Sequence, residues 1–470
     1  MRNTLLLAAA VAAAPATPAA AVAAAPATPA AGPAAERVLT TAPAGHLLHN
    51  SQVFSPDDRL LVCDRRNDET RLAACREVVA VEAATGAEHP VYRLERGGAH
   101  GPGVGAATCS PVAPRVAFIR GLDSASPAEP YAPERRCGML AGLAGEGGAV
   151  HLDGRDVTPP FTPGALRGGS HAHHWSGDGQ WISFTYNDAV VRPPGTGAPP
   201  DDLRTVGVMA PLQAVGVAGA RPGNEFGGAW FSVLVAAVTP DPRPGSDELS
   251  RACEEGWVGA NGYRRPDGSR QHRALAFLGD VRTAGGTRLT EVFLADLPDD
   301  LTRAGPAGPL AGTATRLPAP PAGVAVRRLT RTETRRHPGV QGPRHWVRAS
   351  PDGETIAFLA RDEAGIVQLF GVSPNGGPVR QLSRLDASVE TPFTWSPDGR
   401  SIACAAGGRI QLVEVATGAA RPLTNPSPPG RQPVHAVVFS HRGDLIAFNR
   451  RLPHPGGGHW LQICLVEPGR

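Results

Sequence analysis

The sequence has no lysine, few aromatic residues and almost no excess of charge of one sign. All 46 basic residues of the 470-residue chain are arginines, and 43 acidic residues balance them to a formal net charge of +3. A charge so close to zero gives no electrostatic footprint for nucleic acid or for an anionic membrane surface. The missing lysine is typical of a biased genome composition, and no nucleic-acid partner is expected.

Several catalytic motifs are also missing. Without G-x-S-x-G there is no nucleophile elbow of an α/β-hydrolase, and Walker A, G-x-G-x-x-G and H-E-x-x-H are absent as well. The seven cysteines show no C-x-x-C spacing of the kind found in redox and zinc sites. Beyond the N-terminal segment no apolar run is long enough to cross a bilayer, so the protein is not expected to span a membrane.

The N-terminal residues 1–35 are different in kind from the rest of the chain. One arginine, an apolar run and repeated A-x-A sites resemble a secretory signal peptide, followed by an Ala/Pro-rich linker. We therefore expect export to the periplasm or the medium and a single folded domain over residues 36–470. Export would permit disulfides, and Cys63 and Cys75 are one candidate pair because they flank a short polar hairpin.

The rest of the sequence is rich in turns, with 57 glycines and 48 prolines, and it repeats. Each copy has an apolar strand, a Ser-Pro-Asp-Gly-like turn and a second strand with alternating apolar residues. Proline presets φ at the second turn position and glycine accepts a positive φ at the last, which predicts β-hairpins. The copies read SQVFSPDDRLLVC, AATCSPVAPRVAF, AHHWSGDGQWISF, VRASPDGETIAF, FTWSPDGRSIAC and VVFSHRGDLIAF.

Four short antiparallel strands repeating at about 45 residues predict an all-β fold, a seven-bladed β-propeller. Strands at 227–238, 273–281, 291–298 and 326–330 are expected to form the one blade that lacks the turn motif, with an insertion at about 239–272. The N-terminal strand, 36–43, is expected to complete the last blade and close the ring. A miscount in the middle of the chain would make the number of blades six or eight.

Aligning the copies on the turn serine places several polar residues at the start of the innermost strands. In a propeller these positions line one mouth of the central channel, where ligands enter. They form the predicted ligand-binding rim: His49, Asn50, His171, His173, Arg344, His345, Glu390 and His435.

The histidines of this rim allow two interpretations. His171 and His173 stand two apart on one strand, so alternation would turn both toward one ion, together with His345 and His435. Neutral imidazole is a good ligand for divalent metals, here Mn²⁺, Zn²⁺ or Ca²⁺. Propeller histidines can equally hydrogen-bond the backbone between blades and bind no metal. By the same alternation His174 faces away and is the weakest ligand candidate.

One further stretch, PGSDELSRACEEGWVGANGYRR at 244–265, predicts a short amphipathic helix in a loop. Its carboxylates could bind a cation or act as an acid–base group. Charge pairs at helical spacing with a packing tryptophan explain the same residues structurally. The charged residues and the tryptophan are Asp247, Glu248, Arg251, Glu254, Glu255 and Trp257.

The Ser-Pro-Asp-Gly copies resemble the TolB-like (PD40) propeller superfamily across nearly all of residues 36–470. More narrowly, GALRGGSHAHHWSGDGQWISFTYND, PGSDELSRACEEGWVG, PRHWVRASPDG and GIVQLFGVSPNGG resemble the uncharacterised bacterial YidR-like family. These resemblances imply a propeller and export, and they imply no particular reaction.

The segment SHAHHWSGDG with the rim histidines is also similar, over a small part of the chain, to oligogalacturonate lyase. That resemblance implies a divalent metal that binds a uronate carboxylate, with Arg344 or Arg348 neutralising substrate charge and a histidine or arginine as base. The residues therefore leave three hypotheses open. The first is a binding propeller whose rim holds a glycan, peptide, protein or other small molecule. The second is a metal-dependent lyase or hydrolase of carbohydrates, and the third is a structural partner of envelope proteins.

Overall fold

The repeated turns are held by a hydrogen-bond pattern that explains why their residue types recur. In the first copy the Ser55 hydroxyl donates to Asp57 (Oγ–Oδ1 2.6 Å) and accepts the backbone N–H of Leu60 (3.0 Å). The turn serines 176, 350, 396 and 440 accept the N–H five residues later in the same way. Each turn thus satisfies its own polar groups, and the two flanking strands pair as a hairpin.

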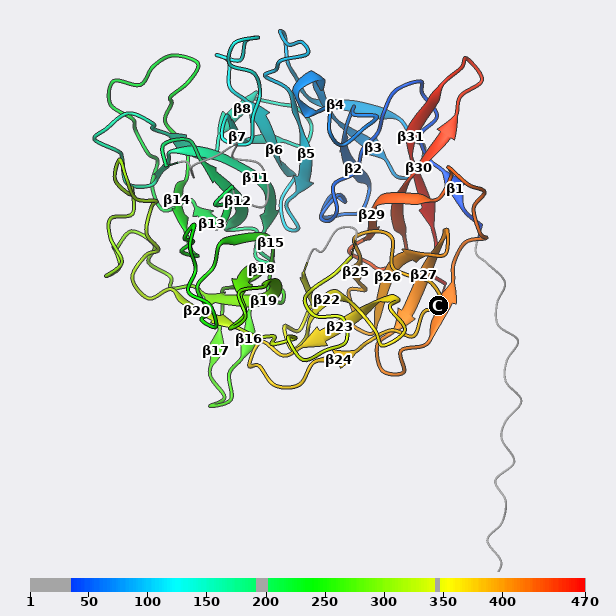
Figure 1. The fold of residues 1–470 in the computed structure, drawn as a ribbon. Helices are drawn as coiled ribbons and strands as arrows, with labels where there is room; N and C mark the ends of the chain where they lie inside the picture. The colour runs from blue at the N-terminus through cyan, green and yellow to red at the C-terminus, as the bar shows by residue number, and fades with distance from the viewer. Residues whose placement is uncertain (1–34, 192–201, 343–346, 470) are drawn as a thin grey trace, which may run out of the picture. The chain divides into compact units, whose positions relative to one another are not determined.

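The computed structural model describes residues 35–191, 202–342 and 347–469, which belong to one compact unit, Pro33–Arg470. This unit is a seven-bladed β-propeller of four-stranded antiparallel blades, so the predicted fold is confirmed (Figure 1). We number the blades 1 to 7 in chain order. The predicted signal peptide and linker, 1–35, lie almost wholly outside the described residues and stay a prediction.

The first three blades occupy the N-terminal half. In blade 1 an inner segment, bridged from Leu47 to Asp64 and from Phe54 to Leu61, joins β2 (Leu60–Asp64), β3 (Glu77–Glu82) and β4 (Glu88–Arg93), with a 3₁₀ turn η1 (Leu72–Ala74). Blade 2 contains β5 (Val104–Cys109), β6 (Arg115–Gly121), β7 (Arg136–Gly142) and β8 (Ala149–His151). Blade 3 contains β11 (Gly168–Trp175), β12 (Ile182–Asp188), β13 (Thr205–Ala210) and β14 (Phe231–Leu234). A short parallel pair, β9 (Gly154–Arg155) and β10 (Ala165–Leu166), precedes blade 3.

Blades 4 to 7 complete the ring. Blade 4 contains β15 (Arg251–Trp257), β18 (Ala274–Arg282), β19 (Arg288–Asp296) and β20 (Ala325–Arg328), and a hairpin of β16 (Tyr263–Arg264) and β17 (Arg270–Gln271) is inserted in it. Blade 5 contains β21 (Arg348–Ala349), β22 (Ile356–Arg361), β23 (Val367–Val372) and β24 (Arg380–Gln381). Blade 6 contains β25 (Thr394–Trp395), β26 (Ser401–Ala406), β27 (Arg409–Glu414) and β28 (Ala420–Pro422). Blade 7 contains β29 (Pro433–Phe439), β30 (Ile446–Pro453) and β31 (His459–Val466).

The ring closes by the N-terminal strand, as predicted. Strand β1 (Arg37–Val38) pairs with β31 as the fourth strand of blade 7 and leaves β31 no open edge. A second link crosses the same boundary, because the buried Asp58 carboxylate of blade 1 accepts the backbone N–H groups of His441 (2.8 Å) and Arg442 (2.9 Å) in the turn of blade 7. Blades 1 and 7 are therefore fastened by backbone pairing and by one buried carboxylate.

The sequence-based interpretation of blade 4 was wrong at its first strand. The expected inner strand at 227–238 contributes β14, the outermost strand of blade 3, and the inner strand of blade 4 is β15. The predicted amphipathic helix over 244–265 is therefore wrong as well. Charges at helical spacing misled the prediction, because Ala252 and Glu255 in this segment are buried within a strand. Strand β15 also falls inside the insertion expected at about 239–272.

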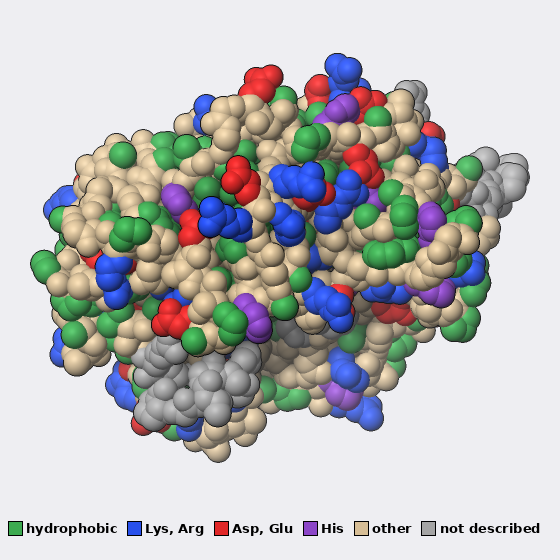
Figure 2. Space-filling view, turned by 90° about the horizontal axis from the view of Figure 1, so that it is seen from above, with side chains coloured by type: hydrophobic (Ala, Val, Ile, Leu, Met, Phe, Trp, Pro, Cys, Tyr) green, Lys and Arg blue, Asp and Glu red, His purple; other side chains and the backbone are tan. Residues whose placement is uncertain are grey.

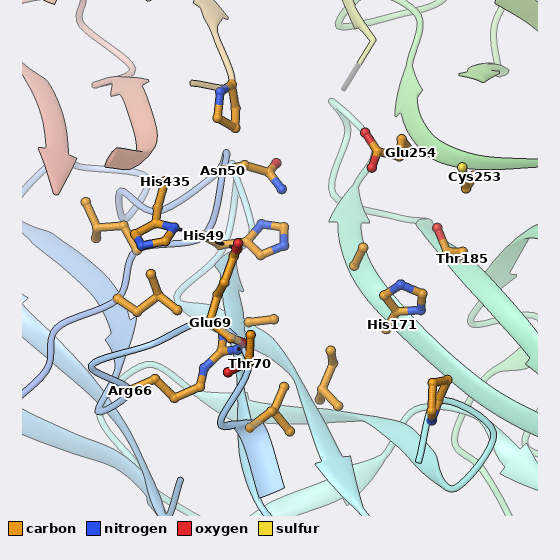
Figure 3. Close-up of a pocket in the computed structure, with 18 of the residues that line it drawn as sticks. His49, Asn50, Arg66, Glu69, Thr70, His171, Thr185, Cys253, Glu254 and His435 are labelled. Atoms are coloured by element: carbon orange, nitrogen blue, oxygen red, sulfur yellow. Dashed lines mark hydrogen bonds and ion pairs between the residues drawn. The ribbon is translucent and has the colours of Figure 1, made fainter. Parts of the chain in front are cut away.

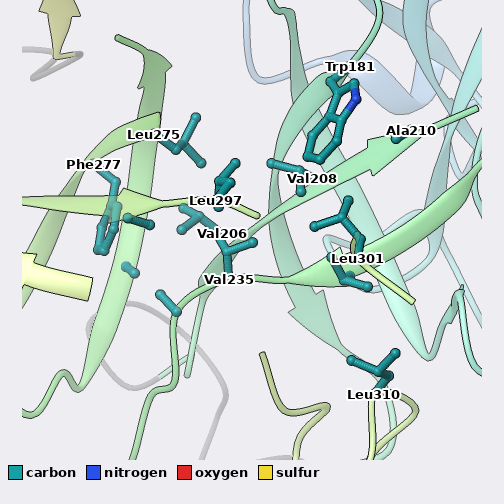
Figure 4. Packing of buried hydrophobic residues seen from close by; sticks show 14 of the residues in the cluster. Trp181, Val206, Val208, Ala210, Val235, Leu275, Phe277, Leu297, Leu301 and Leu310 are labelled. Carbon is teal, nitrogen blue, oxygen red and sulfur yellow. The ribbon is translucent and has the colours of Figure 1, made fainter. Parts of the chain in front are cut away.

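The core consists of apolar clusters between neighbouring blades. The cluster between blades 3 and 4 includes Val206, Val208, Leu275 and Phe277 (Figure 4). Burial of such side chains stabilises the ring by about 1.5–3 kcal/mol each before chain entropy is counted. All seven cysteines are buried and free, so the suggested Cys63–Cys75 disulfide is absent.

The surface seen in Figure 2 mixes arginine and acidic side chains, in keeping with the near-neutral net charge. Hydrophobic side chains are scattered among them on this side of the molecule. Among the described residues, no helix is long and apolar enough to cross a membrane.

Candidate functional site

The inner strands of four blades share a bulge at the same place. The strand register shifts in β5, β11, β15 and β29, and in each strand one non-glycine residue adopts a positive φ. These residues are Ala106 (53°), Ala172 (57°), Glu254 (57°) and His435 (64°). A bulge inserts a residue that has no cross-strand partner and breaks the alternation of side chains. All four bulged residues line one cavity at the channel.

This cavity has a volume of about 660 Å³ and receives residues from at least six blades. His435 and His49 lie on one side of it and His171, Thr185 and Glu254 on the other (Figure 3). The remaining polar lining residues are Asn50, Arg66, Glu69, Thr70, Tyr131, Arg136, Arg204 and Glu390. Residues more than 300 positions apart in the sequence thus face one half-open cavity.

The structure brings most of the predicted rim together. His49, Asn50, His171, Glu390 and His435 all line the cavity. Arg344 and His345 lie outside the described residues, in the segment that precedes β21. The rim therefore stays a proposal as a ligand site, with five of its eight members placed around one cavity.

His173 is not among the lining residues, although the sequence placed it beside His171. Its ring is fully buried, with Nε2 3.1 Å from the Ser170 hydroxyl, and that hydroxyl donates to Asp153 (3.2 Å). The bulge at Ala172 is the reason, because it removes the alternation that would have turned both histidines to one side. Burial lowers the pKa of His173 to about 3, so the ring is neutral at physiological pH.

His174, which alternation placed on the opposite face, lies directly behind the rim. Its Nε2 is 3.4 Å from Asn50 Oδ1, and its ring centre is 5.1 Å from that of His49. Its Nδ1 is 3.7 Å from a Glu255 carboxylate oxygen. Burial, and then the charge of Arg348, lower its pKa well below the usual value. His174 is thus a neutral donor or acceptor that orients two rim residues.

Glu255 and Arg348 complete this buried group; the sequence offered Glu255 as one possible acid–base carboxylate, and the lyase resemblance offered Arg348 as a partner for substrate charge, but neither was placed in the predicted rim. Thr185, which lines the cavity, donates to Glu255 (Oγ1–Oε2 2.6 Å), and Arg348 donates to Asn50. Burial raises the pKa of Glu255 to about 7 and lowers that of Arg348 to about 10. A carboxyl group that titrates near neutral pH beside a polar cavity can hold or release a proton there.

Three residues form a basic wall, which we define as Arg136, Arg204 and Tyr131. Arg136 begins β7 in blade 2, and Arg204 directly precedes β13 in blade 3. Arg136 donates to the Tyr131 hydroxyl (3.1 Å), whereas Arg204 pairs with Asp202 (3.1 Å). The acidic lining residues lie elsewhere around the cavity. One of them, Glu69, has a carboxylate oxygen 3.7 Å from His435 Nδ1.

The predicted metal set is not assembled by the described residues. No group of three or more His, Cys, Asp or Glu side chains that could hold a metal ion occurs in the described part of the chain. His171 and His435 line opposite sides of the cavity, and His173 faces Ser170 and Asp153 (Figure 3). A metal site at this mouth would therefore depend on His345, which is outside the described residues.

Comparison with known proteins gives one close relative of matching length. The chain is 40% identical over 436 residues to the uncharacterised protein YidR of Escherichia coli K12, covering 91% of this chain and 96% of that protein. A family model described as a protein of unknown function (DUF3748) matches residues 103–225. A 55-residue segment is 46% identical to the uncharacterised peptidase YuxL of Bacillus subtilis, which is 12% of this chain and 8% of that protein.

A solved lyase structure with a TM-score above 0.5 supports the propeller fold, whereas a TolB structure is a weaker likeness that carries no argument. An oligogalacturonate lyase from Vibrio parahaemolyticus is 9% identical, with a TM-score of 0.51 over 93% of this chain and 94% of the other. TolB from Acinetobacter baumannii is 13% identical, with a TM-score of 0.35 over 89% and 84% of the two chains. Identities this low bear on the fold alone. With a full-length relative at 40% identity, the chain belongs to the YidR family, and its fold is a seven-bladed β-propeller.

Proposed function

We propose that the protein binds a small polar ligand, a glycan fragment, in the cavity at the mouth of the propeller channel. The observation that carries this proposal is the convergence of polar side chains from at least six blades on one space of about 660 Å³. Ligand sites for small molecules are concave and have volumes of roughly 300–1,000 Å³. A protein partner would be expected to use a broad, flatter surface instead.

The chemistry of the lining favours a ligand with hydroxyl groups. Guanidinium groups are donors, carboxylates are acceptors, and imidazole and hydroxyl groups are both, and all of these occur around the cavity. A sugar hydroxyl both donates and accepts hydrogen bonds, so it can find a partner at many positions of this lining. Among the described lining residues, Tyr131 is the one Phe, Trp or Tyr.

Export belongs to the proposal as well. The apolar N-terminal segment with its A-x-A sites supports a periplasmic or secreted protein, and a glycan fragment is a ligand available there. Fractionation of cells that express the full chain tests this part. Recovery of the protein in the cytoplasm with its N-terminus intact would contradict it.

The binding proposal is tested by calorimetric titration of the full chain with a panel of neutral, amino and acidic mono- and oligosaccharides. We expect at least one sugar to bind and His171→Ala or His435→Ala to weaken it about 10-fold, the cost of one lost hydrogen bond to a buried site. His89→Ala is the matched control, because His89 is exposed on β4 and is not part of the cavity lining. No binding, or equal loss in the control, would contradict the proposal.

A second candidate, an enzyme acting on carbohydrates, is favoured by the proton-holding group behind the rim. Glu255 titrates near neutral pH and accepts a hydrogen bond from Thr185, which lines the cavity. The structural observation that favours this candidate is the proton held by Glu255, and its test concerns proton transfer. Chromatography of the bound sugar after incubation tests for turnover. If the wild-type chain converts the sugar and Glu255→Gln still binds it but does not convert it, the protein is an enzyme and not only a binding protein.

A further inference from the structure

Arg136 is a buried cation without a counter-charge among the described residues. It is 8% exposed and lines the cavity. Its one hydrogen bond to a described residue runs from Nη1 to the Tyr131 hydroxyl (3.1 Å), and its buried Nε has no partner. A buried guanidinium is costly unless it is paired and hydrogen-bonded. The side chain is therefore poised for an anion that enters the cavity.

The other two arginines of the cavity are neutralised within the protein. Arg66 pairs with Asp64 through two nitrogens, Nε to Oδ1 (2.7 Å) and Nη2 to Oδ2 (2.8 Å). Arg204 pairs with Asp202, which it shares with Arg251 (3.2 Å). The basic wall therefore holds more positive than negative charge, and Arg136 is its one arginine without an acidic partner among the described residues.

The charge of Arg136 is felt by its neighbours. Burial lowers the pKa of Arg204, and the positive charges of Arg251 and Arg136 lower it further against the pull of Asp202. Arg136 also helps to lower the pKa of His173. Positive charge accumulates on this side of the cavity, and an anion placed there would relieve the repulsion.

We propose that the ligand is an acidic sugar with one carboxylate, which Arg136 binds beside the Tyr131 hydroxyl. This proposal rests on the proposed function, the binding of a glycan fragment in the same cavity. A planar guanidinium fork matches a carboxylate with two parallel hydrogen bonds. Glu69, Glu254 and Glu390 line the rest of the cavity. The carboxylate of Glu390 disfavours further negative charge on the ligand, so a ligand with a single carboxylate is favoured.

A structural role for Arg136 makes a different prediction. Its stem packs close to Gly169, where an added Cβ would lie 3.0 Å from Arg136 Cγ. If this packing and the bond to Tyr131 were its purpose, Arg136→Gln would lower the thermal midpoint of the free protein. If the guanidinium awaits an anion, removing the uncompensated charge leaves the midpoint unchanged or raises it.

The experiment is calorimetric titration with two matched pairs of sugars, glucose with glucuronate and galactose with galacturonate, since each pair differs only in the carboxylate. We compare the wild-type chain with Arg136→Gln, Arg136→Lys and a control, Arg282→Gln. Arg282 lies on β18 and is not part of the cavity lining. We expect one acid to bind at least about 10-fold more tightly than its neutral partner. Arg136→Gln should remove that preference and leave the neutral sugar's affinity unchanged, and Arg136→Lys should restore part of it.

Each other outcome overturns a defined statement. Equal affinities for acid and neutral sugar, unaltered in Arg136→Gln, overturn the carboxylate proposal and leave the proposed sugar binding intact. Weakening of both sugars with a lower thermal midpoint shows Arg136 to be structural and overturns the carboxylate proposal too. If none of the sugars binds to the wild-type chain, the proposed function fails and the carboxylate proposal fails with it.

Discussion

Glu255 is expected to make the folded protein less stable as the pH rises from about 4.5 to about 7. Burial is the largest cause of its raised pKa, from 4.5 to about 7, and it outweighs the hydrogen bond from Thr185 and the charge of Arg348. The folded chain then keeps a proton that the unfolded chain releases. The resulting stability is complete below pH 4.5 and is lost as the pH rises through about 7.

The size of this effect follows from the shift. At about 1.4 kcal/mol per pKa unit, the rise from 4.5 to about 7 corresponds to about 3 kcal/mol of unfolding free energy. Two other buried groups titrate nearby. Burial raises the pKa of Asp153 to about 6 and lowers that of His173 to about 3, so their effects on stability have opposite signs between about pH 4 and 6.

The comparison of the wild-type chain with Glu255→Gln isolates the one group, because the glutamine stays neutral at every pH. We measure the unfolding free energy in urea at about pH 5 and about pH 8. The difference, variant minus wild type, should be about 2–3 kcal/mol larger at pH 8 than at pH 5. Glu363→Gln, an exposed position, is the control and should show no such gain. Parallel pH profiles for wild type and Glu255→Gln would refute the reasoning and show Glu255 ionised throughout, as one half of an ion pair with Arg348.

Three further predictions concern the ring. Asp58→Ala leaves the N–H groups of His441 and Arg442 without their acceptor and should cost about 2–4 kcal/mol in urea unfolding, and an unchanged midpoint would contradict this. Deleting residues 36–43 removes β1 from the edge of β31 and should lower the thermal midpoint, whereas an equal midpoint would show that the strand does not close the ring. A thiol reagent should leave the six cysteines other than Cys253, which lines the cavity, unmodified in the native protein and should modify all seven in denaturant; rapid native labelling of those six would contradict their burial.

The hairpins could be predicted from the sequence because their cause is local. A serine, an aspartate and a glycine within five positions satisfy the turn's own polar groups, as Ser55 and Asp57 show, so the pattern survives in most blades. The closing strand could be predicted for a similar reason, since the last blade lacks a fourth strand and the first strand lacks a sheet. Blade 4 has no such turn, and its first strand was therefore missed.

The buried part of the site could not be predicted, because it depends on bulges and on contacts between blades. Nothing in the sequence indicates that Ala172 takes a positive φ, and that single residue decides that His173 faces Ser170 and His174 faces Asn50. Arg136 gives no signal either, because its neighbours in the cavity come from other strands. The adjacent glutamates 254 and 255 were one available signal: an acid–base role was left open for them, but they were placed on a helix in a loop and not on an inner strand at the cavity.

Side chains from distant blades converge on one cavity, and we propose that this cavity receives the ligand. A crystal structure of the full chain grown with the tightest-binding sugar tests this most directly. We predict density for the sugar between His171 and His435, with its carboxylate against Arg136. Density only in the groove lined by Asp178, Asn261 and Asp299, or on the outer surface with the cavity empty, would contradict the account.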